Sequence, residues 1–240
     1  MPSLGQNRRT KRNLAGVLAI AGGATGSLIA GTALSDTVYI LNNANSAISG
    51  AGPYGQADVS LTDSTDATIT FTAYSTASDQ FYFVDGSSVD VNVNSTSFTL
   101  GAISGNSMSG SYNDAGSGPQ PVDGRGNFNQ TINSPNSNTN NRSTTITFTL
   151  TDTSGTWASD ASVLTANNVG NYIAAHIGAC DLPSNCVADG ASLATTGYAG
   201  GSITTAVPEP STWAMMLAGF AALGFAAFRT PRKRDASVFS

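Results

Sequence analysis

The central part of this 240-residue chain is predicted to be all-β, an antiparallel, jelly-roll-like β-sandwich between an N-terminal signal helix and a single C-terminal transmembrane helix. Polar and apolar residues alternate in several windows between residues 34 and 206, with the period of a half-buried strand. The same region is rich in Thr, Ser, Asn, Gly and Asp, and it has no helical periodicity. Its length is sufficient for one domain with a core of its own.

Two segments show the alternation most clearly. The one that begins at Ala67 places Ile69 and Phe71 on one face and threonines on the other, and the one that begins at Thr144 repeats this pattern. Asp85-Gly86 is a turn signal between two further segments. The nine predicted strands cover residues 37–41, 57–61, 67–74, 80–84, 88–93, 97–100, 128–132, 144–151 and 172–177.

The boundaries of the predicted sandwich domain are residues 34 and 198. Residues 199–206 are rich in Gly, Ser and Thr and are predicted to be a flexible tether. Residues 105–121 are rich in Gly and Ser, and residues 133–143 hold five asparagines. Both segments are poor in apolar residues, so we expect them to be exposed loops.

Charge is distributed unevenly along the chain. Eight of the ten Lys and Arg residues lie in residues 8–12 and 229–234, so only Arg125 and Arg142 remain between residues 34 and 206. That segment holds thirteen aspartates and no glutamate, which gives it a formal charge of −11. An acidic surface of this kind disfavours nucleic acid as a partner.

Residues 1–33 have the pattern of a cleavable secretory signal peptide. A basic segment precedes an apolar segment at residues 14–30, and small residues at 31–33 predict cleavage by signal peptidase after Ala33. The basic residues are Arg8, Arg9, Lys11 and Arg12. The residues after the arginine pair are polar, so ordinary Sec export is favoured over the twin-arginine route, and an N-terminal anchor is the remaining alternative.

The C-terminal tail has three parts in a fixed order. Val207, Pro208, Glu209 and Pro210 are followed by the uncharged apolar run 213–228. Residues 211–228 would form a helix about 27 Å long, close to the roughly 30 Å of a bilayer core. The run ends at the basic residues Arg229, Arg232, Lys233 and Arg234, a membrane stop over residues 229–234 that would remain cytoplasmic. The tail is therefore predicted to cross the inner membrane once; a buried core helix is the alternative.

The order Pro208-Glu209-Pro210, apolar helix and arginine cluster resembles the PEP-CTERM sorting signal of Gram-negative bacteria, here over residues 207–234. The resemblance implies that an exosortase, a membrane enzyme, recognises and processes the tail after transient anchoring. It also implies export to the cell surface or to a biofilm matrix rich in exopolysaccharide. Residues 124–129, 154–157 and 174–177 are similar to parts of small PEP-CTERM ectodomains, which implies a shared sandwich.

The two cysteines, Cys180 and Cys186, are separated by five residues. Outside the cytoplasm we expect them to form a disulfide that closes a small loop. With His176 they match no zinc-binding spacing.

No catalytic constellation is evident in the sequence. His176 is the single histidine, no G-x-S-x-G elbow is present, and the segment between the signals has no glutamate. We therefore predict no catalytic residues, no cofactor and no enzymatic activity. Calcium remains an alternative, with oxygens from four aspartates. These are Asp63, Asp66, Asp85 and Asp90.

The sequence thus predicts an exported surface or matrix protein with a structural or adhesive sandwich. One alternative is a carbohydrate-binding module for exopolysaccharide, which would carry a row of exposed aromatic side chains. The candidates for that row are Tyr74, Tyr82, Tyr112 and Trp157. The other alternative is a secreted hydrolase that depends on His176.

Overall fold

The computed structural model describes residues 36–45, 47–106, 111–134, 142–182 and 193–203, together with residues 216, 219 and 220. The chain divides into two compact units, Met1–Ala33 and Leu34–Ser240, and all described residues belong to the second. Eleven strands and one 3-10 turn, Asp160–Ser162, make up nearly all of the regular structure in this described part.

Strands form wherever the sequence alternates. The strands are β1 (Thr37–Ala44), β2 (Gly55–Leu61), β3 (Asp66–Ala73), β4 (Asp79–Phe83), β5 (Val89–Val91), β6 (Phe98–Gly105), β7 (Asn113–Val122), β8 (Gly126–Asn133), β9 (Thr145–Asp152), β10 (Ile173–Asp181) and β11 (Thr195–Ile203). Each of the nine predicted segments overlaps one of them, so the prediction of an all-β antiparallel domain is confirmed.

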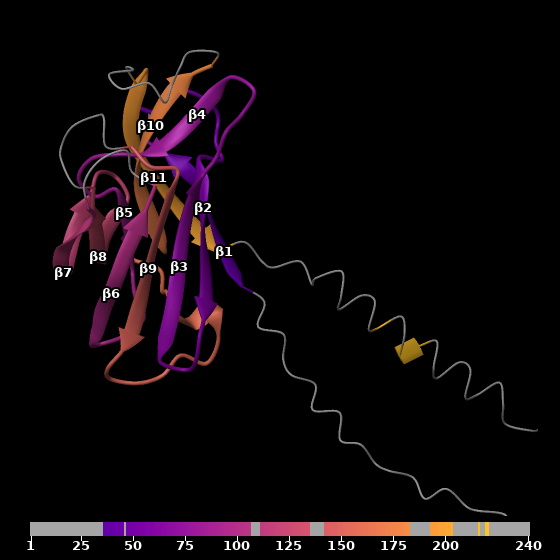
Figure 1. The fold of residues 1–240 in the computed structure, drawn as a ribbon, viewed down its shortest axis with the longest axis vertical. Helices are drawn as coiled ribbons and strands as arrows, with labels where there is room; N and C mark the ends of the chain where they lie inside the picture. Colours follow the sequence, from indigo (N-terminus) through magenta and orange to yellow (C-terminus); the bar gives the residue numbers. More distant parts are fainter. Residues whose placement is uncertain are drawn as a thin grey trace, which may run out of the picture. The chain divides into compact units, whose positions relative to one another are not determined.

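The strands form one antiparallel sheet rather than two separate ones. Its order is β6-β9-β3-β2-β1-β11-β10-β5-β8-β7, and β4 pairs with β10 beside β5. The first and last strands join the two halves, because β1 pairs with β11 from Tyr39↔Ile203 to Ala44↔Ala199. The sheet is folded so that it is nearly closed, with β6, β9, β3 and β2 side by side in one half (Figure 1).

The two halves share a single main core. Phe71 on β3 and Phe83 on β4 meet edge to face with ring centroids 5.9 Å apart, and Phe71 also stacks on Phe148 of β9 at 6.3 Å. All three side chains are at most 1% exposed. Burying side chains of this size stabilises the fold by about 1.5–3 kcal/mol each.

Strand β7 corrects the prediction that residues 105–121 form an exposed loop. It pairs with β8 through a turn in which Gly124 has φ 69°, and its register shifts at two points. The prolines and glycines of β7 remove the alternation that marks other strands, which is why sequence pattern indicated a loop.

Strand β11 corrects the predicted tether. Residues 199–203 pair with β1, residues 199–201 also pair with β10, and Ala199 is fully buried. A Cβ atom at Gly201 would lie 2.6 Å from the carbonyl oxygen of Ile40. The glycines therefore permit close packing in the sheet, and the domain extends to Ile203.

The predicted signal peptide and most of the tail lie outside the described residues. Met216, Gly219 and Phe220 are helical. Within the described part of the chain, no helix has the length and apolarity needed to span a bilayer. The signal helix and the transmembrane helix remain predictions.

Both ends of the domain emerge at the same end of the sheet. β1 begins at Thr37, β11 ends at Ile203, and these strands are antiparallel neighbours in which Tyr39 faces Ile203. A C-terminal attachment point would therefore lie at this end of the domain, close to the new N-terminus that cleavage after Ala33 would create.

Candidate functional site

A large bulge interrupts the strand pairing opposite His176. β10 pairs with β4 through Ile177↔Phe83 and with β5 through Ala175↔Val89. The five residues 84–88 thus lie opposite the single residue His176. The backbone N–H of His176 donates to the carbonyls of both Ser87 and Ser88, at 3.2 and 3.3 Å. Bulges of this kind redirect side chains and are frequent beside functional sites.

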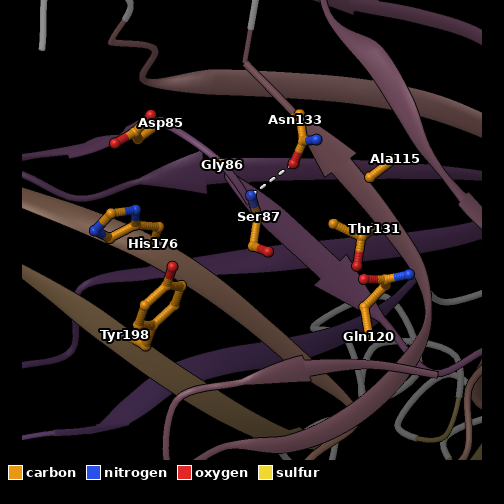
Figure 2. Close-up of a pocket in the computed structure, with 9 residues that line it drawn as sticks. All are labelled: Asp85, Gly86, Ser87, Ala115, Gln120, Thr131, Asn133, His176 and Tyr198. Carbon is orange, nitrogen blue, oxygen red and sulfur yellow. Dashed lines mark hydrogen bonds between the residues drawn. The ribbon is translucent and has the colours of Figure 1, made fainter. Parts of the chain in front are cut away.

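The bulge has a strained backbone that neighbouring groups hold in place. Asp85 and Ser87 have φ values of 55° and 52°, which are uncommon for residues other than glycine. The backbone N–H of Ser87 donates to Oδ1 of Asn133 at 2.7 Å (Figure 2). The hydroxyl of Ser88 donates to the carbonyl of Asp85 and accepts from the N–H of Ser134 at 3.0 Å. The end of β8 therefore fixes the bulge.

His176 and Tyr198 face each other across β10 and β11, on the opposite side of the sheet from the main core. Their rings stack with centroids 4.4 Å apart and planes 19° apart. Burial lowers the pKa of His176, while the neighbouring Asp85 carboxylate partly opposes this shift. The Nδ1 atom of His176 is buried and makes no hydrogen bond within the described part of the chain.

A buried carboxyl group lies on the same face. Asp90 pairs with Ala174 on one side and with Thr131 on the other, and it is 1% exposed. The Thr131 hydroxyl donates to its Oδ1, whereas Oδ2 has no partner among the described residues. Burial raises the pKa of Asp90 well above its usual value, so the neutral form is favoured.

These elements surround a hollow of about 450 Å³, which we call the bulge pocket (Figure 2). Its walls are mainly polar, and none of its lining residues is Lys or Arg. The lining residues are Asp85, Gly86, Ser87, Ala115, Gln120, Thr131, Asn133, His176 and Tyr198. The volume is within the range of small-molecule sites.

A second hollow of about 510 Å³ lies beside the segment between β5 and β6. Its single carboxylate, Asp152, accepts hydrogen bonds at Oδ1 from Ser95, Ser154 and Gly155. This carboxylate is already occupied in holding loops together, so the bulge pocket is the better candidate site.

Comparison with known proteins identifies the C-terminal tail. Residues 206–233 match the family model of the PEP-CTERM protein-sorting motif. The chain carries a PEP-CTERM sorting motif. No curated protein and no solved structure matches the chain.

The PEP-CTERM motif implies an exosortase as processing partner and export toward the cell surface. It begins three residues after β11 ends at Ile203. The predicted motif residues 207–210, the basic residues 229–234 and the cleavage site at Ala33 lie outside the described part of the structure. Cys180 is 2% exposed on β10, Cys186 is not among the described residues, and their disulfide remains a prediction.

The predicted row of exposed aromatic residues is wrong. Trp157 is 3% exposed and Tyr82 is 4% exposed. Tyr74 and Tyr112 are half-buried and pack against the main core. Trp157 belongs to the main core, Tyr82 is buried in a small cluster with Val84 and Cys180, and the aromatic ring that lines a pocket, Tyr198, was not among the candidates.

The four aspartates considered for calcium do not come together as a site. Within the described ranges, no three His, Cys, Asp or Glu side chains are placed to hold a metal ion. Asp63 instead caps its own turn by accepting from the N–H groups of Thr65 and Asp66. Asp90 is enclosed in the sheet.

Sequence reasoning singled out His176 and the Asp85-Gly86 turn, but not their proximity. The bulge exists because β4 and β5 share one edge of β10, about ninety residues further along the chain. Gln120 belongs to a strand that was predicted to be a loop. No local pattern indicated that these segments would surround one hollow.

Proposed function

We propose that this PEP-CTERM protein is processed by an exosortase and released to the cell surface or extracellular matrix, where its β domain is a structural or adhesive component. The observation that carries the proposal is the sorting motif at residues 206–233, directly after the last strand of a folded domain. Transient anchoring in the inner membrane would precede release. The formal charge of −11 between residues 34 and 206 suits a soluble exported domain that avoids nucleic acid.

The position of the domain ends supports this order of events. Because β1 begins and β11 ends at the same end of the sheet, the tail would hold the domain by one end. Tyr198 lies five residues before Ile203 on β11, about 17 Å along the strand. The bulge pocket would therefore stay clear of an anchor at the tail.

The experiment is the intact mass of the protein from membrane and extracellular fractions of its host. Under the proposal, the extracellular protein runs from Leu34 to about Pro208. A mass that runs through Ser240, found only in the membrane fraction, would show that the tail is a permanent anchor. We expect Glu209→Ala to block release, and Asp235→Ala, which changes a carboxylate beyond the matched motif, to leave it intact.

We also propose that the domain is not an enzyme. The base of a Ser-His-Asp triad needs a carboxylate to orient its ring, and Nδ1 of His176 has no such hydrogen bond among the described residues. A hydrolase activity that is lost in His176→Ala, and retained when a residue of the second hollow such as Thr156 is changed to Ala, would contradict this.

A further inference from the structure

The polar groups around the bulge pocket are largely unused by the protein itself. Seven of its nine lining residues have side chains that can form hydrogen bonds. Within the described part of the chain, the Asp85 carboxylate, the Gln120 amide and the Tyr198 hydroxyl form no hydrogen bond. Groups of this kind are hydrated when the pocket is empty, and a ligand can replace that water.

The charges in the pocket restrict the class of ligand. Asp85 is the single carboxylate among the lining residues, none of them is Lys or Arg, and burial lowers the pKa of the one basic side chain, His176. A phosphate, sulfate or uronate would therefore meet a like charge and no counter-charge. A divalent cation would need several oxygen ligands, and no metal-holding group is found among the described residues.

The pattern of donors and acceptors restricts it further. Carboxylates only accept hydrogen bonds, whereas amides and phenols both donate and accept. A ligand that satisfies Asp85 must donate, and one that also satisfies Gln120 and Tyr198 can do both. Hydroxyl groups both donate and accept hydrogen bonds without carrying a charge. The stacked rings of His176 and Tyr198 form an aromatic wall that the C–H groups of a hydroxyl-rich ligand can contact (Figure 2).

The pocket is also fixed before any ligand arrives. The hydrogen bond from Ser87 to Asn133 and those between Ser88, Asp85 and Ser134 hold the bulge against β8. Little conformational entropy would be lost when a ligand binds to a wall of this kind. These hydrogen bonds therefore maintain the strained φ values of Asp85 and Ser87, two residues that line the hollow.

We propose that the bulge pocket binds a neutral, hydroxyl-rich ligand of the size of one uncharged sugar residue, such as a unit of a neutral polysaccharide. The bulge pocket would then be the site through which the domain adheres, and a neutral sugar would be its ligand. The proposal rests on the proposed adhesive role only for the place where the protein meets such a ligand. Asp85 accepts hydrogen bonds from ligand hydroxyls, Gln120 and Tyr198 provide further polar contacts, and the ring pair contacts the apolar side of the ligand.

The test uses the full-length protein in detergent and three immobilised panels: neutral gluco-, manno- and galacto-oligosaccharides, uronate oligomers, and glucosamine oligomers. We expect binding to at least one neutral oligosaccharide. Asp85→Asn keeps the shape and the tolerance for positive φ but removes the charge, and Gln120→Ala removes the amide. Each of these two variants should weaken binding of the oligosaccharide about tenfold, which is the effect expected when one hydrogen bond to the ligand is weakened or lost.

The matched control is Thr156→Ala, which removes a polar side chain from the second hollow and should change binding less than twofold. Circular dichroism confirms that each variant is folded. Three results would overturn the proposal: no neutral oligosaccharide binds, the uronate or glucosamine panel binds more tightly, or both variants bind as the unchanged protein does. If the protein binds neutral sugars but keeps its C-terminal tail and remains in the membrane, the proposed sorting is contradicted and the proposed binding site is still supported.

Discussion

Replacement of Phe71 by Leu tests whether the two halves of the sheet share one core. Phe71 is fully buried on β3, and its ring contacts Phe83 on β4 and Phe148 on β9. The first contact crosses between the halves, since β4 is bound to β10 and β3 is bound to β2 and β9. Leucine keeps most of the buried apolar volume but removes both ring pairs.

The expected loss follows from those two contacts. An aromatic pair contributes about 0.5–1.5 kcal/mol beyond its buried area, so losing two costs about 1–3 kcal/mol. For a domain of this size, a loss of 2 kcal/mol lowers the melting temperature by about 4–8 °C. The free energy of unfolding is measured by urea titration of the full chain, followed by tryptophan fluorescence, to which Trp157 in the same core contributes.

Phe98→Leu is the matched control. Phe98 is half-buried at the start of edge strand β6 and takes part in none of the ring pairs found among the described residues. We expect it to cost less than about 1 kcal/mol. Equal losses for Phe71→Leu and Phe98→Leu would refute the idea that Phe71 links the halves.

Three further predictions concern the outer face of β5, β10 and β11. Burial raises the pKa of Asp90, so above pH 3.8, its ordinary pKa, the folded state keeps a proton that the unfolded state loses. The free energy of unfolding should therefore fall as pH rises above 3.8. In urea titrations across about pH 4–8, Asp90→Asn should abolish this fall. The pKa of His176 is lowered by burial, so its contribution is complete above about pH 6.5 and lost as pH falls below this value; His176→Gln should remove that loss in the same titrations. Gly200→Val should destabilise the domain by about 1–3 kcal/mol in thermal unfolding, because a Cβ atom at this position would lie 2.5 Å from Oδ1 of Asn171. Gly116→Val is the control for backbone strain alone, because Gly116 has a positive φ and a Cβ atom there meets nothing within 4 Å.

The strands that could be predicted are those whose sequence reflects the sheet directly. Ile69 and Phe71 face the core while the threonines between them face outward, and Thr70 meets Thr147 of the neighbouring strand at 3.1 Å. Such a pattern needs no knowledge of partners. β7 and β11 could not be predicted this way, since their glycines and prolines satisfy constraints of packing that only the neighbouring strands impose.

The candidate site was less predictable than the fold. The sequence raised His176 as the residue on which an alternative hydrolase would depend, and the structure shows it stacked on Tyr198. Its neighbours come from the bulge between β4 and β5 and from β7, β8 and β11, so their convergence depends on the order of the strands in the sheet. The row of exposed aromatic residues failed for the same reason, because whether a ring faces inward depends on pairing and not on its spacing.

Strand β11 connects the proposed binding site to the sorting motif, since it carries Tyr198 of the bulge pocket and leads into the motif. It lies within the sheet and is hydrogen-bonded to β1 on one side and to β10 on the other. A pull on Ile203 along the strand would load both ladders in shear, so many hydrogen bonds would have to break together. An edge strand such as β6 could instead be peeled away one bond at a time. The attachment of the tail to an internal strand therefore suits a domain that holds a ligand while the membrane, or the matrix, holds its other end.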